Sequence, residues 1–353
     1  MRLKNKNMGR RDLFKIIGGA LGISALSYYL GLSNQADALP NDQLPEYADG
    51  DMGLPVFRGP YLQKDVSLAA LLYRADVSVL TALCDQSLNV VASSPYRYVP
   101  LTSNVMLVYA DMLVSSLNER DSQVGFFPET EAGFWILTVA MQKTSNGEIP
   151  HHLAWFLPNL FVTEGNSIAT GREVYGFNKQ AGEINKPSEI YSPRFAVDVL
   201  GIKRFAPDAV AQKERLFEVS ISAEEQSQIG WSDWSSAKDY FTSAIMNSIR
   251  PDMGSSVIGF VAQTLVNHIP LVFLKQMRSA SNVEKASYQK IVEAPLQIRE
   301  FYAGAKLTQP CTLSLTHLDS HPLAKRLGLQ AVQTNLLGAW LNVDFILELG
   351  AEL

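Results

Sequence analysis

The chain has 353 residues, a hydrophobic content of 47% and a formal net charge of −5. This composition is typical of a globular protein that buries a substantial core, and it excludes the disordered and collagen-like classes. Beyond residues 1–38 no cluster of basic residues occurs, which argues against nucleic-acid binding.

The N-terminal segment, residues 1–38, has the pattern of an export signal. Arg10 and Arg11 precede a glycine-containing apolar run over 16–32, and a small-x-small cleavage pattern ends at Ala38. Paired arginines before such a run are typical of twin-arginine signals, which the Tat export machinery reads. We therefore expect a periplasmic or secreted protein, with an uncleaved membrane anchor as the alternative because the run is at the short limit of a spanning helix.

The remainder, residues 39–353, is predicted to form a single domain of the mainly β (α+β) class, because its apolar runs are rich in Val, Ile, Tyr and Phe and are separated by turn residues. Helices are predicted at 77–84, with Asp76 as the cap, and at 236–250 and 255–266, with a short helix or turn over 282–289. Strands, largely antiparallel, are predicted in chain order at 66–74, 98–111, 134–142, 154–162, 190–203, 218–221, 290–294, 296–302, 311–318 and 340–349.

One lysine, Lys179, ends a strand-like run that begins at Gly171. A lysine amine in water is protonated at neutral pH and cannot attack a carbonyl, but burial among apolar groups or a nearby cation favours its neutral form. A neutral amine forms a Schiff base with a ketone, and the iminium then accepts the electrons released by C–C cleavage. The alternative is an exposed lysine at a strand end, the usual environment of this residue type.

The order of three motifs resembles that of acetoacetate decarboxylases. The run 171–180, Gly-Arg-Glu-Val-Tyr-Gly-Phe-Asn-Lys-Gln, resembles the family's Gly-Arg-Glu…Phe/Tyr-Pro-Lys-Lys segment. Upstream, 57–61 and 72–76 resemble its Arg-Gly-Pro-Tyr…Tyr-Arg-Thr-Asp block. The resemblance implies a cone-like antiparallel β-barrel with peripheral helices, a reactive lysine inside, no external cofactor and a homo-oligomer. Relative to compact family members, 224–268 is predicted to be a helical insertion that covers the barrel mouth or forms a subunit contact.

The same segment supplies candidate substrate-binding residues. If 172–179 is extended, Glu173, Tyr175 and Phe177 share one face with the lysine. Arg58 and Arg172 are the candidates for pairing a substrate carboxylate bidentately, with a structural ion pair as the alternative role for each.

Two acids are candidates for proton transfer. Residues 126–133, Phe-Phe-Pro-Glu-Thr-Glu-Ala-Gly, resemble the family segment that carries a functional glutamate. We favour Glu131, with Glu129 in reserve, since a pocket carboxylate with a raised pKa acts as proton donor or base. The alternative is a pair of solvated acids in a turn before a strand.

Three positions depart from the family pattern. Gln180 replaces the second lysine, Asn178 replaces the proline, and Val66 stands near an arginine of characterised decarboxylases. The predicted function is therefore a Schiff-base lyase acting on a keto acid or related carbonyl compound. The alternatives are an aldolase- or dehydratase-type enzyme of the same family, or a barrel that binds a small molecule without catalysis.

Two further residue groups have side chains that bind metals or form disulfides in other proteins. His317, Asp319 and His321 have ligand chemistry, but the Asp-Ser-His-Pro run around them is equally typical of a turn, so no metal is predicted. Cys84 and Cys311 are predicted to be separate buried thiols and not a disulfide.

Overall fold

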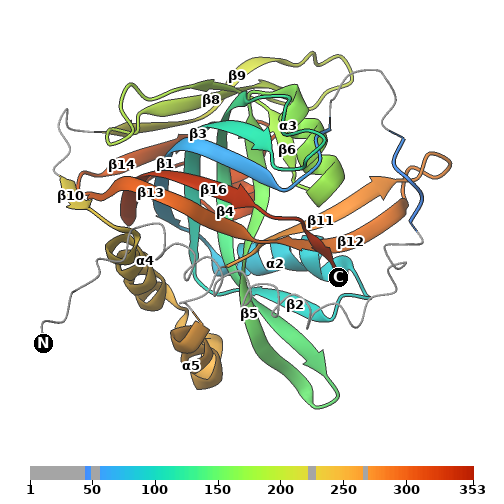
Figure 1. Cartoon of the computed structure of the whole chain (residues 1–353). Coiled ribbons are helices and arrows are strands. Elements are labelled where there is room, and N and C mark those ends of the chain that lie inside the picture. The colour runs from blue at the N-terminus through green and yellow to red at the C-terminus, as the bar shows by residue number, and fades with distance from the viewer. Residues whose placement is uncertain (1–43, 49–55, 222–227, 265–268) are drawn as a thin grey trace, which may run out of the picture.

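The computed structural model describes residues 44–48, 56–221, 228–264 and 269–353, and it is mostly β (Figure 1). The predicted signal, 1–38, lies outside the described residues, so export stays a prediction. Among the described helices, none is both long and apolar enough to cross a membrane.

A twelve-stranded sheet forms the body of the protein, and its pairs are antiparallel except where β5 meets β6 and β11. The strands follow the order β10-β13-β16-β1-β3-β4-β5-β11-β12-β17, with β2 beside β4 and β6 beside β5. No ladder among the described residues joins the two ends of this order, so the closed cone-like barrel stays a prediction. The strands of this sheet are β1 (Tyr61–Arg74), β2 (Tyr96–Pro100), β3 (Asn104–Ser116), β4 (Phe127–Thr144), β5 (Gly147–Val162), β6 (Lys179–Ala181), β10 (Gln228–Trp231), β11 (Leu271–Arg278), β12 (Ala286–Ala294), β13 (Leu296–Leu307), β16 (Leu337–Leu347) and β17 (Ala351–Glu352).

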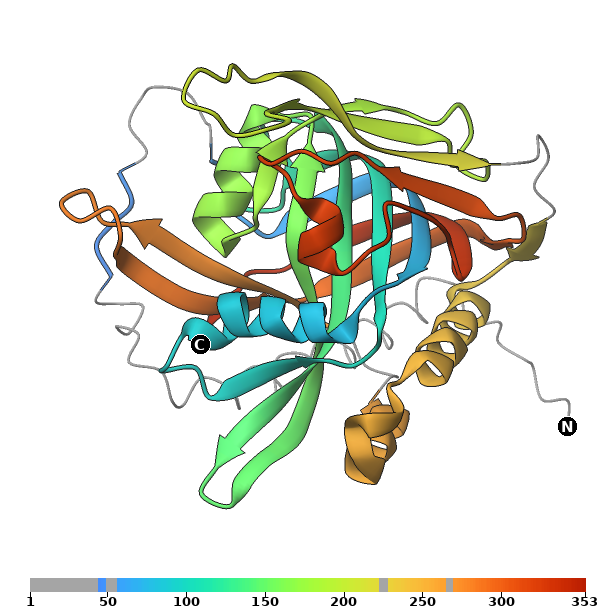
Figure 2. The ribbon, with the colours of Figure 1, turned by 180° about the vertical axis from the view of Figure 1, so that it is seen from behind.

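A second, five-stranded sheet lies across one face of the large one, where β8 and β9 run over the top in both views (Figures 1 and 2). Its order is β15-β14-β9-β8-β7. Phe217 of this sheet makes edge contacts with Phe134 and Phe161 of the large sheet, which places the main hydrophobic core between the two. The strands are β7 (Glu183–Asn185), β8 (Phe195–Gly201), β9 (Gln212–Ile221), β14 (Cys311–Leu315) and β15 (Val332–Thr334).

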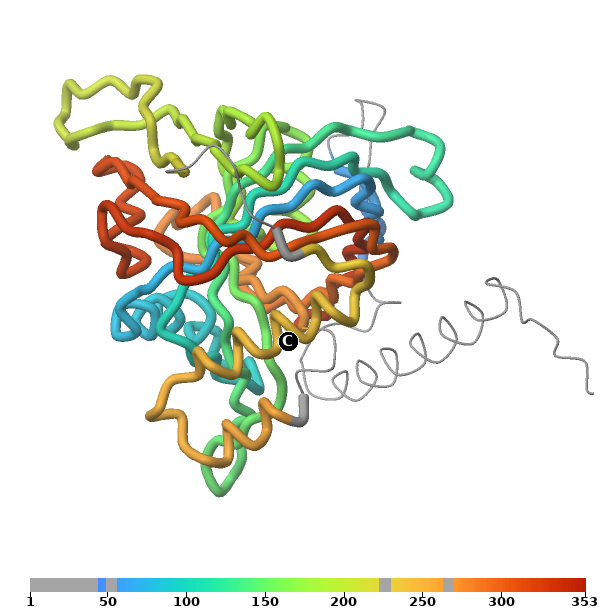
Figure 3. Tube along the Cα trace, turned by 90° about the vertical axis from the view of Figure 1, so that its left-hand side faces the viewer, coloured from blue at the N-terminus to red at the C-terminus, as the bar shows by residue number. Residues whose placement is uncertain are grey.

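The helices predicted at 77–84 and 236–250 are confirmed, and the one at 255–266 is confirmed as far as residue 264, where the described residues end. α2 (Val77–Ser87) begins at Asp76, whose carboxylate accepts a hydrogen bond from the Ser78 N–H, and α6 (Leu323–Leu327) packs beside it. Within the predicted insertion, α4 (Trp234–Ser248) and α5 (Gly254–Thr264) follow β10, with the 3-10 turn η4 (Pro251–Met253) between them. Figure 3 shows them alongside the strands of the large sheet.

Tryptophans anchor α4 to the large sheet. Trp231 stacks against Tyr240 and Phe241 of the helix, and Trp234 reaches Phe301 of β13. The helix therefore covers part of one face of the large sheet.

Strand extents differ from the prediction where tertiary pairing overrides local pattern. β1 and β9 begin several residues earlier than predicted, while β8 and β14 are shorter. The predicted helix or turn at 282–289 is wrong in its second half, because residues from Ala286 onward form β12. This polar segment is a strand because β11, which the sequence prediction missed, supplies its backbone partners.

The most consequential correction concerns the segment before Lys179. Residues 172–179 are not extended: α3 (Gly165–Thr170) continues into a π-helical turn, η3 (Gly171–Tyr175), and only then does β6 begin. The Gly171 carbonyl accepts hydrogen bonds from the N–H groups of both Gly176 and Phe177. Gly176 ends the turn at φ +85°, a left-handed conformation that glycine adopts without strain.

Candidate active site

Lys179 is the first residue of β6, and its side chain is buried, with 9% of its surface exposed. β6 lies parallel to β5, and the turn η3 passes over the lysine stem. A Cβ atom built on Gly171 would lie 2.8 Å from Lys179 Cδ and 3.0 Å from Cε. The side chain thus runs through a space that exists because residue 171 has no side chain.

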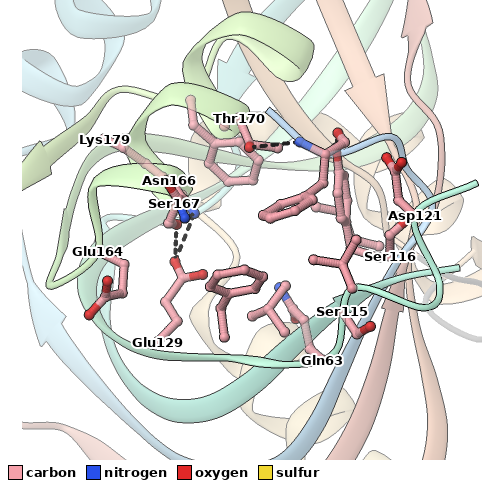
Figure 4. A pocket seen from close by; sticks show the side chains of 18 of the residues that line it. Gln63, Ser115, Ser116, Asp121, Glu129, Glu164, Asn166, Ser167, Thr170 and Lys179 are labelled. Atoms are coloured by element: carbon pink, nitrogen blue, oxygen red, sulfur yellow. Dashed lines mark hydrogen bonds and ion pairs between the residues drawn. The ribbon is translucent and has the colours of Figure 1, made fainter. Parts of the chain in front are cut away.

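The Lys179 amine contacts a carboxylate and a hydroxyl. Nζ lies 2.9 Å from Glu129 Oε1 and 2.5 Å from Ser167 Oγ, and the Ser167 hydroxyl also donates to the same glutamate oxygen. The Phe177 ring centroid lies 5.2 Å from Nζ. Figure 4 shows Lys179 and Ser167 converging on the Glu129 carboxylate.

Ser167 is a site residue that the sequence prediction missed. It lies on α3, and no local motif marks it; only the turn of the chain through α3 and η3 brings its hydroxyl back to the amine.

Glu131 lies on the same face of β4 as Glu129, because side chains two residues apart on a strand point the same way. Burial raises the pKa of Glu131 to about 7; the charge of Lys179 opposes the rise and the Glu129 carboxylate adds to it. The carboxyl group lies deep in the protein, although part of the side chain borders a large cavity. An acid with this pKa exchanges protons readily near neutrality.

Two cavities border Lys179. The smaller, of about 60 Å³, lies on the side of Glu129, Ser167 and Glu164 and is the one drawn in Figure 4. The larger, of about 620 Å³, lies on the side of Glu131 and extends between the large sheet and α4. The Lys179 side chain, only 10% exposed, therefore borders two cavities and does not extend into bulk solvent.

The predicted substrate-binding residues divide into two groups. Tyr175 and Phe177 are buried and border the small cavity, and Phe177 also borders the large one. Arg58, Arg172 and Glu173 border neither cavity, so the predicted shared face of Glu173 with the lysine is wrong, because the helical turn replaces a strand there.

The two arginines have structural partners. Arg58 Nη1 lies 2.6 Å from the Asp121 carboxylate. The exposed Arg172 donates to the backbone carbonyl of Lys179 at 3.3 Å. The alternative role stated for Arg58, a structural ion pair, is thus the one observed, while Arg172 supports β6 through a backbone contact.

The three departures from the family pattern have clear positions. Val66 is buried and borders the large cavity. Gln180 Oε1 accepts a hydrogen bond from His321 Nε2 at 3.0 Å, on the opposite face of β6 from Lys179. Asn178 donates to the Pro158 carbonyl at 2.7 Å. Position 180 therefore faces away from the amine in this structure.

Neither of the other residue groups forms a metal or disulfide site among the described residues. No group of three or more His, Cys, Asp or Glu side chains is arranged there to hold a metal ion; His317 pairs with Asp319 at 3.2 Å. Cys84 and Cys311 are free and buried, as predicted.

Comparison with solved structures supports the fold, whereas comparison of the sequence with known families and curated proteins finds no match. No protein-family model matches the chain, and no curated protein matches it. Among solved structures, the acetoacetate decarboxylase of Legionella pneumophila is similar with a TM-score of 0.52, at 15% identity over 89% of this chain and 98% of that one. The enduracididine biosynthesis enzyme MppR, complexed with pyruvate, gives a TM-score of 0.51 at 13% identity over 90% and 98% of the two chains.

A third similar structure, an acetoacetate decarboxylase-like enzyme from Sphingomonas wittichii RW1, has a TM-score of 0.50 at 12% identity, covering 85% of this chain and 94% of that one. The chain thus has the acetoacetate decarboxylase-like fold that its motifs predicted.

Proposed function

We propose that the protein is a Schiff-base enzyme of the acetoacetate decarboxylase-like class, acting on a keto acid or related carbonyl compound with Lys179 as the nucleophile. The observation that carries the proposal is the position of the amine, which is buried between two glutamates where two cavities meet. Lysines are rarely buried without a specific partner or role.

The first step forms an iminium from the carbonyl substrate. Nζ attacks only as the neutral amine, and Glu129, 2.9 Å away, accepts the proton that the ammonium must lose. Nζ then adds to the carbonyl carbon. The carbonyl oxygen leaves as water, taking one proton from the amine and one from Glu131, whose raised pKa of about 7 keeps a proton available.

The iminium then accepts the electron pair of the bond that breaks. In decarboxylation this is the bond to the carboxylate carbon; in aldol cleavage it is the bond to the hydroxyl-bearing carbon. Protonation of the resulting enamine and hydrolysis by water return the free lysine, so no external cofactor takes part. Pyruvate in the similar MppR structure, and in another the condensation product of pyruvate and imidazole 4-carboxaldehyde, support both a keto acid and a C–C bond-forming or -breaking reaction as candidates.

Reductive trapping tests the proposal. Incubation with acetoacetate or pyruvate and borohydride is expected to add the reduced substrate to the peptide that contains Lys179. Lys179→Ala is expected to abolish both the adduct and turnover, while Lys186→Ala, a half-exposed lysine paired with Asp111, retains them. An adduct that persists in Lys179→Ala, or no adduct in the unaltered protein from either keto acids or neutral ketones, rejects the assignment.

The second candidate is a barrel that binds a small carbonyl, lipid-like or organic-acid ligand without catalysis. The observations that favour it are the Glu129 carboxylate against the lysine amine, which is also the arrangement of a structural ion pair, and the valine at position 66. Such a protein would bind ligand reversibly and give no covalent adduct on reduction.

The remaining parts of the proposal concern assembly and location. We propose closure of the large sheet into a cone-like barrel, a homo-oligomer, a single domain over 39–353, and twin-arginine export to the periplasm or beyond. Light scattering of the purified protein tests the oligomer. Replacing Arg10 and Arg11 together by lysine is expected to block export of a reporter fused after residue 38, and continued export would exclude the Tat route.

A further inference from the structure

We propose that the carbonyl substrate of Lys179 is bulky, apolar and uncharged, such as a β-hydroxy ketone with a long-chain or aryl body that undergoes aldol cleavage, and not a small keto acid. This inference rests on the Schiff-base function proposed above. It is carried by the size of the large cavity, the chemistry of its walls and the charges around the amine.

The cavity is far larger than a small keto acid requires. Its volume is about 620 Å³, the space of roughly twenty liquid water molecules at ~30 Å³ each. Pockets of this size enclose ligands as large as a typical drug molecule. A small keto acid attached to Lys179 would leave most of the cavity filled with water.

The walls of the cavity are predominantly apolar. Strands β1, β3, β4 and β16 direct aliphatic and aromatic side chains inward, and α4 adds aromatic and aliphatic side chains from the other side. Such walls favour an apolar ligand, because burial removes apolar surface of both partners from water. Representative lining residues are Leu68, Met106, Trp135, Phe241, Leu341 and Phe345.

The charges near the amine disfavour a substrate carboxylate. The Glu129 carboxylate contacts the Lys179 amine, and Glu164 borders the small cavity. No arginine borders either cavity in the described part of the chain, so the bidentate carboxylate partner that arginine provides is missing there. Apart from Lys179, the one basic side chain among the described lining residues is Lys238, on α4.

A neutral carbonyl compound avoids bringing another anion next to these acids. Its polar carbonyl end reaches the amine and the two glutamates, while its apolar body fills the space toward α4. This arrangement also accounts for Val66, which borders the cavity. A valine makes apolar contact with a neutral substrate, whereas an arginine at that position would pair with the carboxylate of a keto acid.

Trapping with matched carbonyl compounds tests the inference. The unaltered full-length protein is incubated with 2-undecanone, acetone or acetoacetate under borohydride reduction, and the half-saturating concentration for the Lys179 adduct is measured by mass spectrometry. Each fully buried methylene strengthens binding by about fourfold. Burial of about three or four of the eight additional methylenes of 2-undecanone is therefore expected to lower its half-saturating concentration ~100-fold below that of acetone. Acetoacetate is expected to be no better than acetone.

A matched pair of variants on α4 adds a second measurement. Ala244 borders the cavity, whereas Ser243 does not border it and is exposed. Ala244→Trp is expected to raise the half-saturating concentration of 2-undecanone at least tenfold with little change for acetone, and Ser243→Trp to change neither.

The outcomes separate the two proposals. Acetoacetate that labels Lys179 at an equal or lower concentration than 2-undecanone overturns the substrate inference and leaves the Schiff-base function standing. No Lys179 adduct from any of the three compounds overturns both. The comparison among compounds uses the unaltered protein, so it decides the matter even when a variant does not fold.

Discussion

The replacement of Glu131 by glutamine makes a quantitative prediction about pH and stability. Glu131 is buried beside Glu129, and its pKa rises from 4.5 to about 7 in the folded protein. The folded state therefore holds this proton to higher pH than the unfolded chain does. Because the folded state binds more protons between these two pKa values, the free energy of unfolding falls as pH rises through that window and levels off above it.

The size of the effect follows from the shift. Each pKa unit corresponds to about 1.4 kcal/mol, so ionising Glu131 between pH 5 and pH 8.5 costs about 2–3 kcal/mol of stability for a shift from 4.5 to about 7. Part of the side chain borders the large cavity and is open to water, which reduces the cost; we expect about 1–2 kcal/mol. Glutamine has no proton to lose, so the free energy of unfolding of Glu131→Gln should not fall in this way as the pH rises. Relative to the unaltered protein, the variant should therefore gain about 1–2 kcal/mol between pH 5 and pH 8.5.

Urea unfolding at the two pH values measures the difference. The control is Glu148→Gln, an exposed acid 3.6 Å from Arg97, which should change stability by less than about 1 kcal/mol at either pH. If Glu131→Gln changes the free energy of unfolding equally at pH 5 and pH 8.5, the carboxyl group does not hold a proton in the folded state, and its assignment as proton donor fails with it.

Two other replacements test the site and the core. Gly171→Ala should lower the rate of Lys179 trapping ~10- to 100-fold while leaving the melting temperature nearly unchanged, because the new Cβ would lie 2.8 Å from the lysine stem and small displacements of a reacting group are costly. The control is Gly165→Ala, whose Cβ meets nothing within 4 Å. Equal trapping rates in the two variants would refute the steric argument. Glu293→Ala should destabilise the fold by about 3–5 kcal/mol in urea unfolding, since Glu293 is fully buried and pairs with His152 at 2.6 Å; a loss below about 1 kcal/mol would show that this pair is not structural.

Much of the site was predictable because the motifs specify which residue types occupy the site positions. Lys179, Glu129 and Glu131 were found from the resemblance, and the structure brings all three together. Their order of importance was harder to predict: Glu129, the reserve choice, is the acid whose contact with the amine is observed, while Glu131 has the raised pKa.

The local conformation before the lysine could not be predicted, because it depends on tertiary contacts. Val174, Tyr175 and Phe177 favour a strand by residue type, yet the chain forms a π-helical turn there. Ser167 was missed for the same reason, since its approach to the amine depends on that turn. The strand β11 was missed because its apolar residues continue an earlier apolar run, and its pairing with β12 is visible only in three dimensions.

The glycine that ends this turn links the lysine to a distant hairpin. A Cβ on Gly176 would lie 2.4 Å from the Lys275 Cα atom and 2.8 Å from the Leu274 carbonyl oxygen, so backbone of β11 occupies the place of any side chain there. Insertions at the exposed tip of the β11–β12 hairpin leave this contact intact, whereas a shift of β11 by one residue would press on the chain three residues before the nucleophile. The glycine three positions ahead of the lysine is therefore required by the backbone packing of this chain, and a larger residue there would displace the segment that carries the nucleophile.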